Sequence, residues 1–171
     1  LPATRPMFAS RSDRLLVELL EHAGPGGLLQ RLKSAGLANA VDADTWERTP
    51  GYGSLLLTVD LTEAGQRQVH EVLRLTFAWI EFLRRSPFPR AFFDDRARIG
   101  ALQETYANRD EGFALVQRLA QQALYYPLAV AERAGSAWGA PDEAAYRRLL
   151  FALTPDNLLA MMAAHGITSF F

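Results

Sequence analysis

The sequence contains no cysteine, which excludes disulfide bonds, thiolate metal sites and a cysteine nucleophile. It also has no excess of charge of either sign, because 18 Lys and Arg residues stand against 19 Asp and Glu residues, for a formal net charge of −1. Such a chain has no surplus of cations to replace the counterions of a nucleic acid. We therefore expect no nucleic-acid partner.

Long apolar runs are absent too. No stretch approaches the ~20 apolar residues of a membrane-spanning helix, and the first residues lack the charged and then apolar layout of a signal peptide. We expect no membrane partner and a cytoplasmic location, with the periplasm as the alternative. The sequence begins at Leu1 without a Met and ends on the apolar pair Phe170-Phe171. We expect it to be a piece of a longer protein.

Metal-binding motifs are missing as well. The histidines His22, His70 and His165 are far apart, and none belongs to a His-x-x-His or His-x-x-x-His pair. We therefore expect no metal site in this chain. We expect His70 to be half-exposed on a helix and His165 to face solvent. His22 follows a predicted helix, where the helix dipole favours a cation, so it is either a helix-end cation or a functional residue.

The residues that are present describe a folded domain. The chain has 171 residues, of which 49% are hydrophobic and 22% are charged, and this composition predicts a single domain over residues 1–171. Apolar residues at helical spacing, together with capping residues, predict several helices. Their ranges are 12–23, 28–35, 62–85, 89–106, 108–123 and 141–153.

Strands are predicted before and after the main run of helices. Residues 37–43 and 53–62 alternate in the period of two of a strand, and we expect a long polar loop over 44–52 to join them as an antiparallel hairpin. A last strand is predicted over 158–164. The fold class is therefore α+β, a two-layer sandwich of a mostly antiparallel sheet with helices packed on one face. We expect Trp79 to lie in the core and Trp46 in the loop to be exposed.

Two further patterns have simple structural interpretations. Gly24-Pro25-Gly26-Gly27 precedes a helix, as a phosphate loop does, but it lacks the Gly-Lys-Ser/Thr ending and follows a helix instead of a strand. We interpret it as a turn. The carboxylates of Asp94, Asp95 and Glu104 could do acid/base chemistry in a self-sufficient enzyme. A solvated helix face is the favoured interpretation.

Several segments together resemble one protein family. They are Leu20-Glu21-His22-Ala23-Gly24-Pro25-Gly26-Gly27-Leu28-Leu29, Leu32-Lys33-Ser34-Ala35-Gly36-Leu37, Thr58-Val59-Asp60-Leu61-Thr62-Glu63-Ala64-Gly65, Tyr125-Tyr126-Pro127 and Leu153-Thr154-Pro155-Asp156-Asn157-Leu158. In this combination the chain resembles the insulinase/pitrilysin family of zinc metallopeptidases, the inverzincins, over nearly its whole length. Family members consist of homologous α/β domains that close around a chamber. The segments match the second, non-catalytic domain.

The resemblance implies that catalysis takes place elsewhere. The family motif His-x-x-Glu-His does not occur in this sequence. It implies that the zinc ligands and the glutamate base belong to other domains of the same peptidase, which would be partners of this one. No residue of this chain is then expected to be catalytic or to bind metal, and the isolated fragment is expected to be inactive.

The resemblance also implies a peptide-anchoring role, because in relatives a turn and an edge strand hold the N-terminal part of a peptide substrate. An edge strand with small side chains exposes N–H and C=O groups to which a peptide can add. The matching residues are His22, Gly26, Asn39, Ala40, Val41, Asp42 and Ala43. In relatives this strand is glycine-rich, whereas here it reads Val41-Asp42-Ala43-Asp44. The two carboxylates lead us to expect a preference for basic or free-amino peptide ends.

The function expected from the sequence is that of a substrate-anchoring, chamber-forming domain of a bacterial zinc-dependent endopeptidase. The peptidase of pyrroloquinoline quinone biosynthesis is the first candidate, and a pitrilysin-like protease is the second. One alternative is a non-catalytic scaffold subunit of the same family. The other is the self-sufficient carboxylate enzyme.

Overall fold

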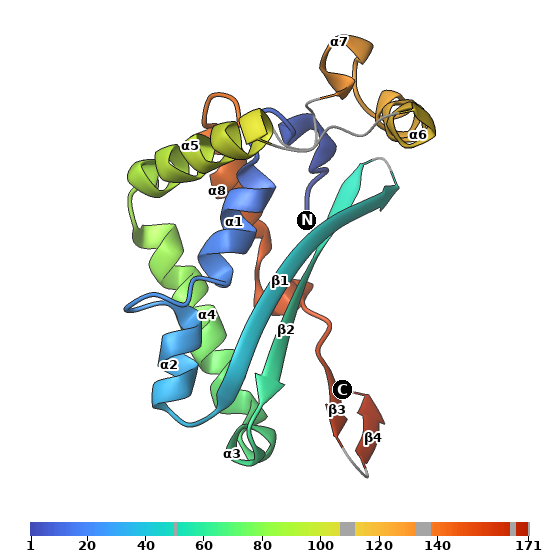
Figure 1. Ribbon diagram of the computed structural model, residues 1–171. Helices are drawn as coiled ribbons and strands as arrows, with labels where there is room; N and C mark the ends of the chain where they lie inside the picture. Colours follow the sequence, from blue (N-terminus) through green and yellow to red (C-terminus); the bar gives the residue numbers. More distant parts are fainter. Residues whose placement is uncertain (50, 107–111, 133–137, 165–166, 171) are drawn as a thin grey trace.

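The computed structural model describes residues 1–49, 51–106, 112–132, 138–164 and 167–170. Helices and strands are both present, which confirms the α+β class (Figure 1). In chain order the elements are η1 (Arg5–Met7), α1 (Ser12–Leu20), α2 (Leu28–Ser34), β1 (Ala38–Thr49), β2 (Tyr52–Leu61), α3 (Glu63–Arg67), α4 (Val69–Arg85), α5 (Arg90–Tyr106), α6 (Gly112–Ala123), α7 (Leu128–Ala131), α8 (Glu143–Ala152), η2 (Pro155–Asn157), β3 (Met161–Ala164) and β4 (Ile167–Phe170).

The described strands form two separate antiparallel hairpins. β1 pairs with β2, and β3 pairs with β4, each as a two-stranded sheet. Helices α1, α2 and α4 lie on one side of the long β1–β2 hairpin, and the short β3–β4 hairpin lies on the other side (Figure 1). The last predicted strand is therefore shorter than expected, since β3 begins only at Met161.

The predicted long loop between the first two strands is wrong. β1 continues to Thr49, and β2 begins at Tyr52, directly after Gly51 with its φ of 110°. The residues assigned to the loop pair across the hairpin, with Asp44 opposite Leu56 and Trp46 opposite Ser54. Asp44 and Trp46 lie on an exposed face, whereas the Glu47 side chain is buried against the N-terminal segment, so polarity did not mark a loop here.

The predicted long helix over 62–85 is also wrong in one respect, because it is two helices. The backbone of Gln68, with φ −125° and ψ 41°, separates α3 from α4. The predicted start is confirmed, since the hydroxyl of Thr62 accepts a hydrogen bond from the Gly65 N–H at 3.0 Å. A Cβ at Gly65 would overlap the carbonyl oxygen of Leu37, so only glycine lets α3 approach the start of β1 this closely.

Smaller corrections apply at other helix ends. α1 ends at Leu20 instead of residue 23, and the residue before its first turn is Arg11, in a left-handed conformation with φ 48°. Ser12, the first residue of α1, shares a hydrogen bond with the Ser10 hydroxyl at 2.9 Å. The predicted start of the 108–123 helix at Asn108 and Glu111 lies outside the described residues, as does His165.

The core is centred on α1. Leu15, Leu16, Val17 and Leu20 are all at most 1% exposed, and α1 packs against β1 and α8. Trp79 of α4 is buried as predicted, and its indole N–H donates to the Leu19 carbonyl oxygen at 3.3 Å. The core therefore links α1 to the hairpin, to α4 and to α8 at once.

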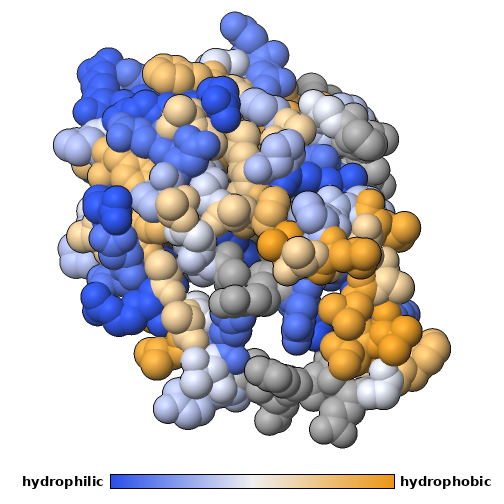
Figure 2. Space-filling view, turned by 90° about the horizontal axis from the view of Figure 1, so that it is seen from above, coloured by the Kyte–Doolittle hydropathy of each residue, from blue (hydrophilic) through white to orange (hydrophobic). Residues whose placement is uncertain are grey.

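Helix α6 has little cover among the described residues. None of its residues is buried, and Phe113 and Val116 are 81% and 63% exposed. Leu128 of α7 is similarly open, at 82%. Figure 2 shows apolar side chains gathered at the end of the molecule where α6 and α7 lie. The apolar face predicted for this helix thus does not contribute to the core around α1.

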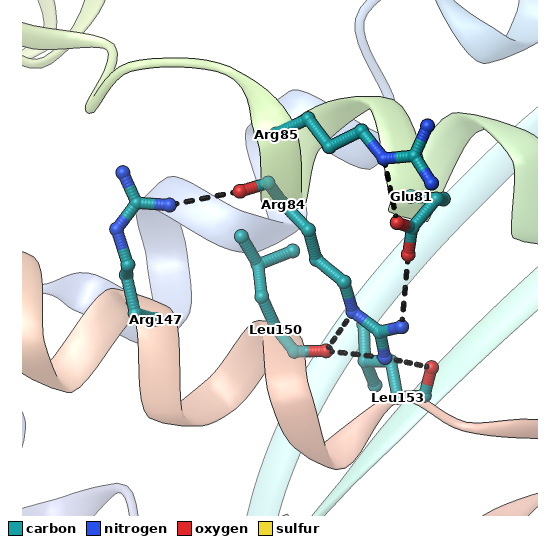
Figure 3. Close-up of polar contacts among 6 residues, drawn as sticks. All are labelled: Glu81, Arg84, Arg85, Arg147, Leu150 and Leu153. Carbon is teal, nitrogen blue, oxygen red and sulfur yellow. Dashed lines mark hydrogen bonds and ion pairs between the residues drawn. The ribbon is translucent and has the colours of Figure 1, made fainter.

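Two arginines fasten α4 to α8 (Figure 3). Arg84 of α4 donates to the Leu150 carbonyl oxygen at 3.2 and 3.1 Å and to that of Leu153 at 2.9 Å. In return, Arg147 of α8 donates to the carbonyl oxygens of Arg84 at 2.9 Å and Ser86 at 3.3 Å. The last carbonyl groups of a helix lack hydrogen-bond donors within the helix. Here an arginine of each helix donates to carbonyl oxygens at the C-terminal end of the other helix.

We expect Arg84→Ala to lower the free energy of unfolding by about 1–3 kcal/mol, because it leaves the C-terminal carbonyls of α8 without their charged donor. The matched control is Arg85→Ala. Arg85 is 80% exposed on its side chain and pairs only with Glu81 among the described residues, so its loss should have little effect. Urea denaturation of both variants tests this. Equal losses of stability in the two variants would contradict the role of Arg84 in joining α4 to α8.

Candidate functional site

The predicted site residues come from two segments, the turn between α1 and α2 and the first half of β1. The structure joins them through a residue that was not predicted. The carboxylate of Glu21, directly before His22, accepts a hydrogen bond from the Ala43 N–H at 2.9 Å. The end of α1 therefore lies against the edge of β1. His22 is half-buried, with its ring edge-on to Phe92 at a centroid distance of 5.7 Å.

The Gly-Pro-Gly-Gly segment forms a tight turn, as interpreted from the sequence. The Gly27 N–H donates to the Gly24 carbonyl oxygen at 3.0 Å, and a Cβ at Gly27 would overlap the carbonyl oxygen of His22. Gly26 has a φ of 83° and bonds to α2, since its N–H donates to the Gln30 side chain and its carbonyl accepts from Arg31 at 3.0 Å. The turn therefore holds His22 close to the start of α2.

The side chains of β1 alternate between two faces. Val41 and Ala43 are buried toward the helices, whereas Asn39, Asp42 and Asp44 are exposed, and Ala40 lies between these extremes. Asp42 lies opposite Thr58, and Asp44 opposite Leu56. Further along the same face Trp46 is exposed, as predicted. The predicted site residues therefore offer two exposed carboxylates, those of Asp42 and Asp44, and a backbone edge beside α1.

The backbone groups of β1 alternate as well. In an antiparallel pair, residues whose N–H and C=O face the partner strand alternate with residues whose groups face away. Because the Ala43 N–H donates to Glu21, Ala43 faces away from β2, and so do Val41 and Thr45. The Thr45 N–H is taken by the Asp44 carboxylate at 2.8 Å. Within the described ranges, no side chain or loop bonds to the outward N–H and C=O of Val41.

Beside this edge is a surface hollow of about 290 Å³. It is lined by Arg14, Glu18, Glu21, His22, Ala23 and Arg96. Glu18 pairs with Arg14 at 3.3 Å and with Arg96 at 2.8 Å, so its charge is balanced. Glu21 has no ion pair with any residue that the structure describes. Of the two glutamates that line this hollow, Glu21 is thus the one that accepts a hydrogen bond from the edge of β1.

The other candidates are separate from this edge. Asp94 pairs with Arg90 at 2.9 Å and Asp95 with Arg98 at 3.5 Å, all with largely solvent-exposed side chains on α5. This arrangement supports a solvated face. His70 lies exposed on α4, in line with the half-exposed helix position predicted for it. Over the described ranges, no group of three or more His, Cys, Asp or Glu residues could hold a metal ion. No helix there is long and apolar enough to cross a membrane.

Sequence reasoning missed Glu21 because its partner is 22 positions away, on another element. The only local signal is a charged residue at the end of the buried leucine stripe of α1. It also missed Glu47, whose side chain is 4% exposed and accepts hydrogen bonds from the Thr4 N–H at 2.6 Å and the Arg5 N–H at 2.9 Å. Glu47 fixes the N-terminal segment to the hairpin.

Comparison with known proteins gives several similarities. The chain is 28% identical over 121 residues to the insulin-degrading enzyme of Homo sapiens, which covers 71% of this chain and 12% of that protein. It is 26% identical over 169 residues to Protease 3 of Salmonella typhimurium, covering 96% of this chain and 18% of that protein. No family model matches the chain. These relatives support the resemblance to insulinase/pitrilysin peptidases.

A solved structure agrees with the fold. The chain matches the crystal structure of pitrilysin with a TM-score of 0.78 at 24% sequence identity, over 88% of this chain and 16% of that one. At this identity the match shows a shared fold. The chain spans less than a fifth of the length of these proteins, 12% of the human enzyme and 18% of the Salmonella one.

Glu47 gives a pH-dependent prediction. Burial alone would raise the pKa of Glu47, but hydrogen bonds from the Arg5 and Thr4 backbone, the Thr4 hydroxyl and the charge of Arg5 together lower it below its ordinary value of 4.5. A lowered pKa in the folded state means that the ionised carboxylate stabilises the protein above pH 4.5 and that this contribution is lost as the pH falls through the lowered pKa.

We therefore expect Glu47→Gln to lower the free energy of unfolding by about 1–3 kcal/mol at neutral pH. The difference from the unaltered protein should shrink as the pH falls below 4.5. Urea denaturation across this pH range measures it. Glu71→Gln, which removes an exposed partner of Arg74, is the control and should have little effect. A difference that grows on acidification would contradict this role of Glu47.

Proposed function

We propose that this chain is a single, non-catalytic domain over residues 1–171 of a bacterial zinc-dependent endopeptidase, and that it anchors peptide substrates along the edge of β1. The observation that carries the proposal is the outward-facing N–H and C=O of Val41, next to the end of α1. An extended peptide can bond to such groups as an added strand. The similarity to insulin-degrading enzyme and Protease 3 supports a peptide as the occupant.

The exposed face of β1 would add selectivity. A peptide lying along this edge places alternate side chains on the two faces of the sheet. On the exposed face, Asp42 and Asp44 present carboxylates to solvent, beside the apolar side chains of Trp46 and Leu56. A basic side chain or a free amino group of the peptide can pair with these carboxylates. Each exposed pair contributes only ~0.2–1 kcal/mol, so the backbone supplies the anchoring.

Zinc chemistry belongs to another part of the proposed protein. The sequence has no His-x-x-Glu-His motif, and the described side chains offer no cluster that could ligate zinc. We infer that zinc and the general base are supplied by other domains, which would form the chamber wall together with this one. The isolated fragment would then bind peptides without cleaving them.

The finer assignments belong to the same proposal. The peptidase of pyrroloquinoline quinone biosynthesis is the first candidate for the parent protein and a pitrilysin-like protease the second, in the cytoplasm or alternatively in the periplasm. A non-catalytic scaffold subunit is the alternative function. The full-length protein distinguishes the two, since an endopeptidase loses its cleavage of peptides on chelation of zinc and a scaffold subunit cleaves none.

The edge-strand proposal is tested with two peptides and the full-length protein, with chelator present to prevent cleavage. The first is a short acetylated and amidated peptide of alternating Thr and Val with a fluorophore near its C-terminus. The second has the same sequence with every other backbone nitrogen methylated. We expect the methylated peptide to bind at least about tenfold more weakly by fluorescence anisotropy, because it cannot pair with the strand. Equal affinities would contradict strand addition.

The selectivity is tested with Asp42→Asn/Asp44→Asn. At low salt we expect affinity for a peptide with a free amino terminus and a basic first residue to fall by about three- to tenfold, and affinity for the acetylated peptide to stay unchanged. Asp60→Asn is the matched control, because Asp60 is an exposed carboxylate on β2, opposite Ala40. An unchanged affinity of the double variant for the basic peptide would contradict the selectivity.

A further inference from the structure

The central donor of the β1 edge is already occupied in the free chain. Ala43 faces outward, and its N–H is bonded to Glu21 at 2.9 Å. A peptide that pairs with Val41 and continues along the edge needs this N–H two residues further on. The peptide and the Glu21 carboxylate therefore compete for the same hydrogen atom.

We propose that Glu21 acts as a latch on the edge of β1, which closes the Ala43 N–H in the free protein and must move away before a peptide can add along the strand. This inference rests on the proposed function that peptides bind at this edge. It makes Glu21 a residue that opposes binding, although it is next to the residues proposed to bind.

The position of Glu21 makes release feasible. It is the residue after the last turn of α1, so its backbone is fixed by the buried helix while its half-buried side chain can turn. Glu18 is held by Arg14 and Arg96, but Glu21 has no such ion pair within the described part of the chain. A single side-chain hydrogen bond therefore holds the latch closed.

Replacing the Glu21 carboxylate by a peptide carbonyl at the Ala43 N–H also costs free energy. A carboxylate accepts a backbone N–H bond roughly twice as strong as one to a neutral acceptor. A peptide carbonyl that replaces Glu21 therefore recovers only part of the bond that it breaks. The released carboxylate swings into the adjacent hollow of about 290 Å³, where Arg14 and Arg96 are the positively charged residues. Peptides that pair with the strand bind despite this latch.

The experiment compares Glu21→Ala and Glu21→Gln in the full-length protein, with chelator present and the acetylated Thr/Val peptide as the probe. This peptide carries no charge, so the change in charge at Glu21 does not act on it directly. We expect Glu21→Ala to bind it about three- to tenfold more tightly than the unaltered protein. Glu21→Gln keeps a neutral acceptor and should give an intermediate affinity.

The matched control is Glu18→Gln, one turn earlier in α1 and lining the same hollow, which should leave the affinity unchanged. An unchanged or weaker affinity of Glu21→Ala would overturn the latch. The methylated peptide separates this failure from that of the proposed function. If the protein discriminates against the methylated peptide but Glu21→Ala gains no affinity, only the latch is wrong. If both peptides bind equally to all variants, strand addition itself is wrong.

Discussion

The burial of α1 is the constraint on which the rest of the structure depends. Its leucines and Val17 are enclosed between β1, α8 and the Trp79 side of α4. Burying each large aliphatic side chain stabilises the fold by about 1.5–3 kcal/mol, so the helix cannot slide along its axis or turn about it. Because α1 is fixed, Glu21, the residue after its last turn, is held at one position on the edge of β1.

Polar contacts then fix the surrounding elements to this core. Arg84 and Arg147 connect the ends of α4 and α8, and Glu47 holds the N-terminal segment against the hairpin. Each of these contacts pairs a charged side chain with backbone groups of another element, which hydrophobic burial alone would leave without partners. The apolar core determines which elements meet, and these charged contacts determine where their ends lie.

Much of this architecture was predictable from local patterns. The leucine stripe of α1, the buried Trp79 and the cap at Thr62 all follow from spacing and residue type, and the structure confirms them. The predicted start of the 141–153 helix is confirmed as well, since the Asp142 side chain accepts a hydrogen bond from the Ala145 N–H at 2.8 Å. Features that depend on distant partners were not predictable. Residues 44–47 resemble a loop in sequence although they pair with β2, because Asp44 lies on the exposed face and Glu47 bonds to the distant N-terminal segment.

In the candidate site, too, some features were predictable from the sequence and others depend on distant partners. The residues of β1 were named from the resemblance, and their alternation between buried and exposed faces agrees with a strand. Glu21 escaped notice because its role depends on a contact between the end of a helix and a strand edge, and no local pattern encodes that distance. The sequence also did not indicate that β3 and β4 form a sheet of their own, because strand pairing is a tertiary property.

The central claim is that peptides add to the outer edge of β1. The most direct measurement is amide hydrogen exchange of the full-length protein, with chelator present, with and without saturating acetylated Thr/Val peptide. The account predicts slower exchange in the segment containing Val41 and Ala43 on binding, and unchanged exchange in β3. Saturable binding without any added protection at Val41 and Ala43 would contradict it.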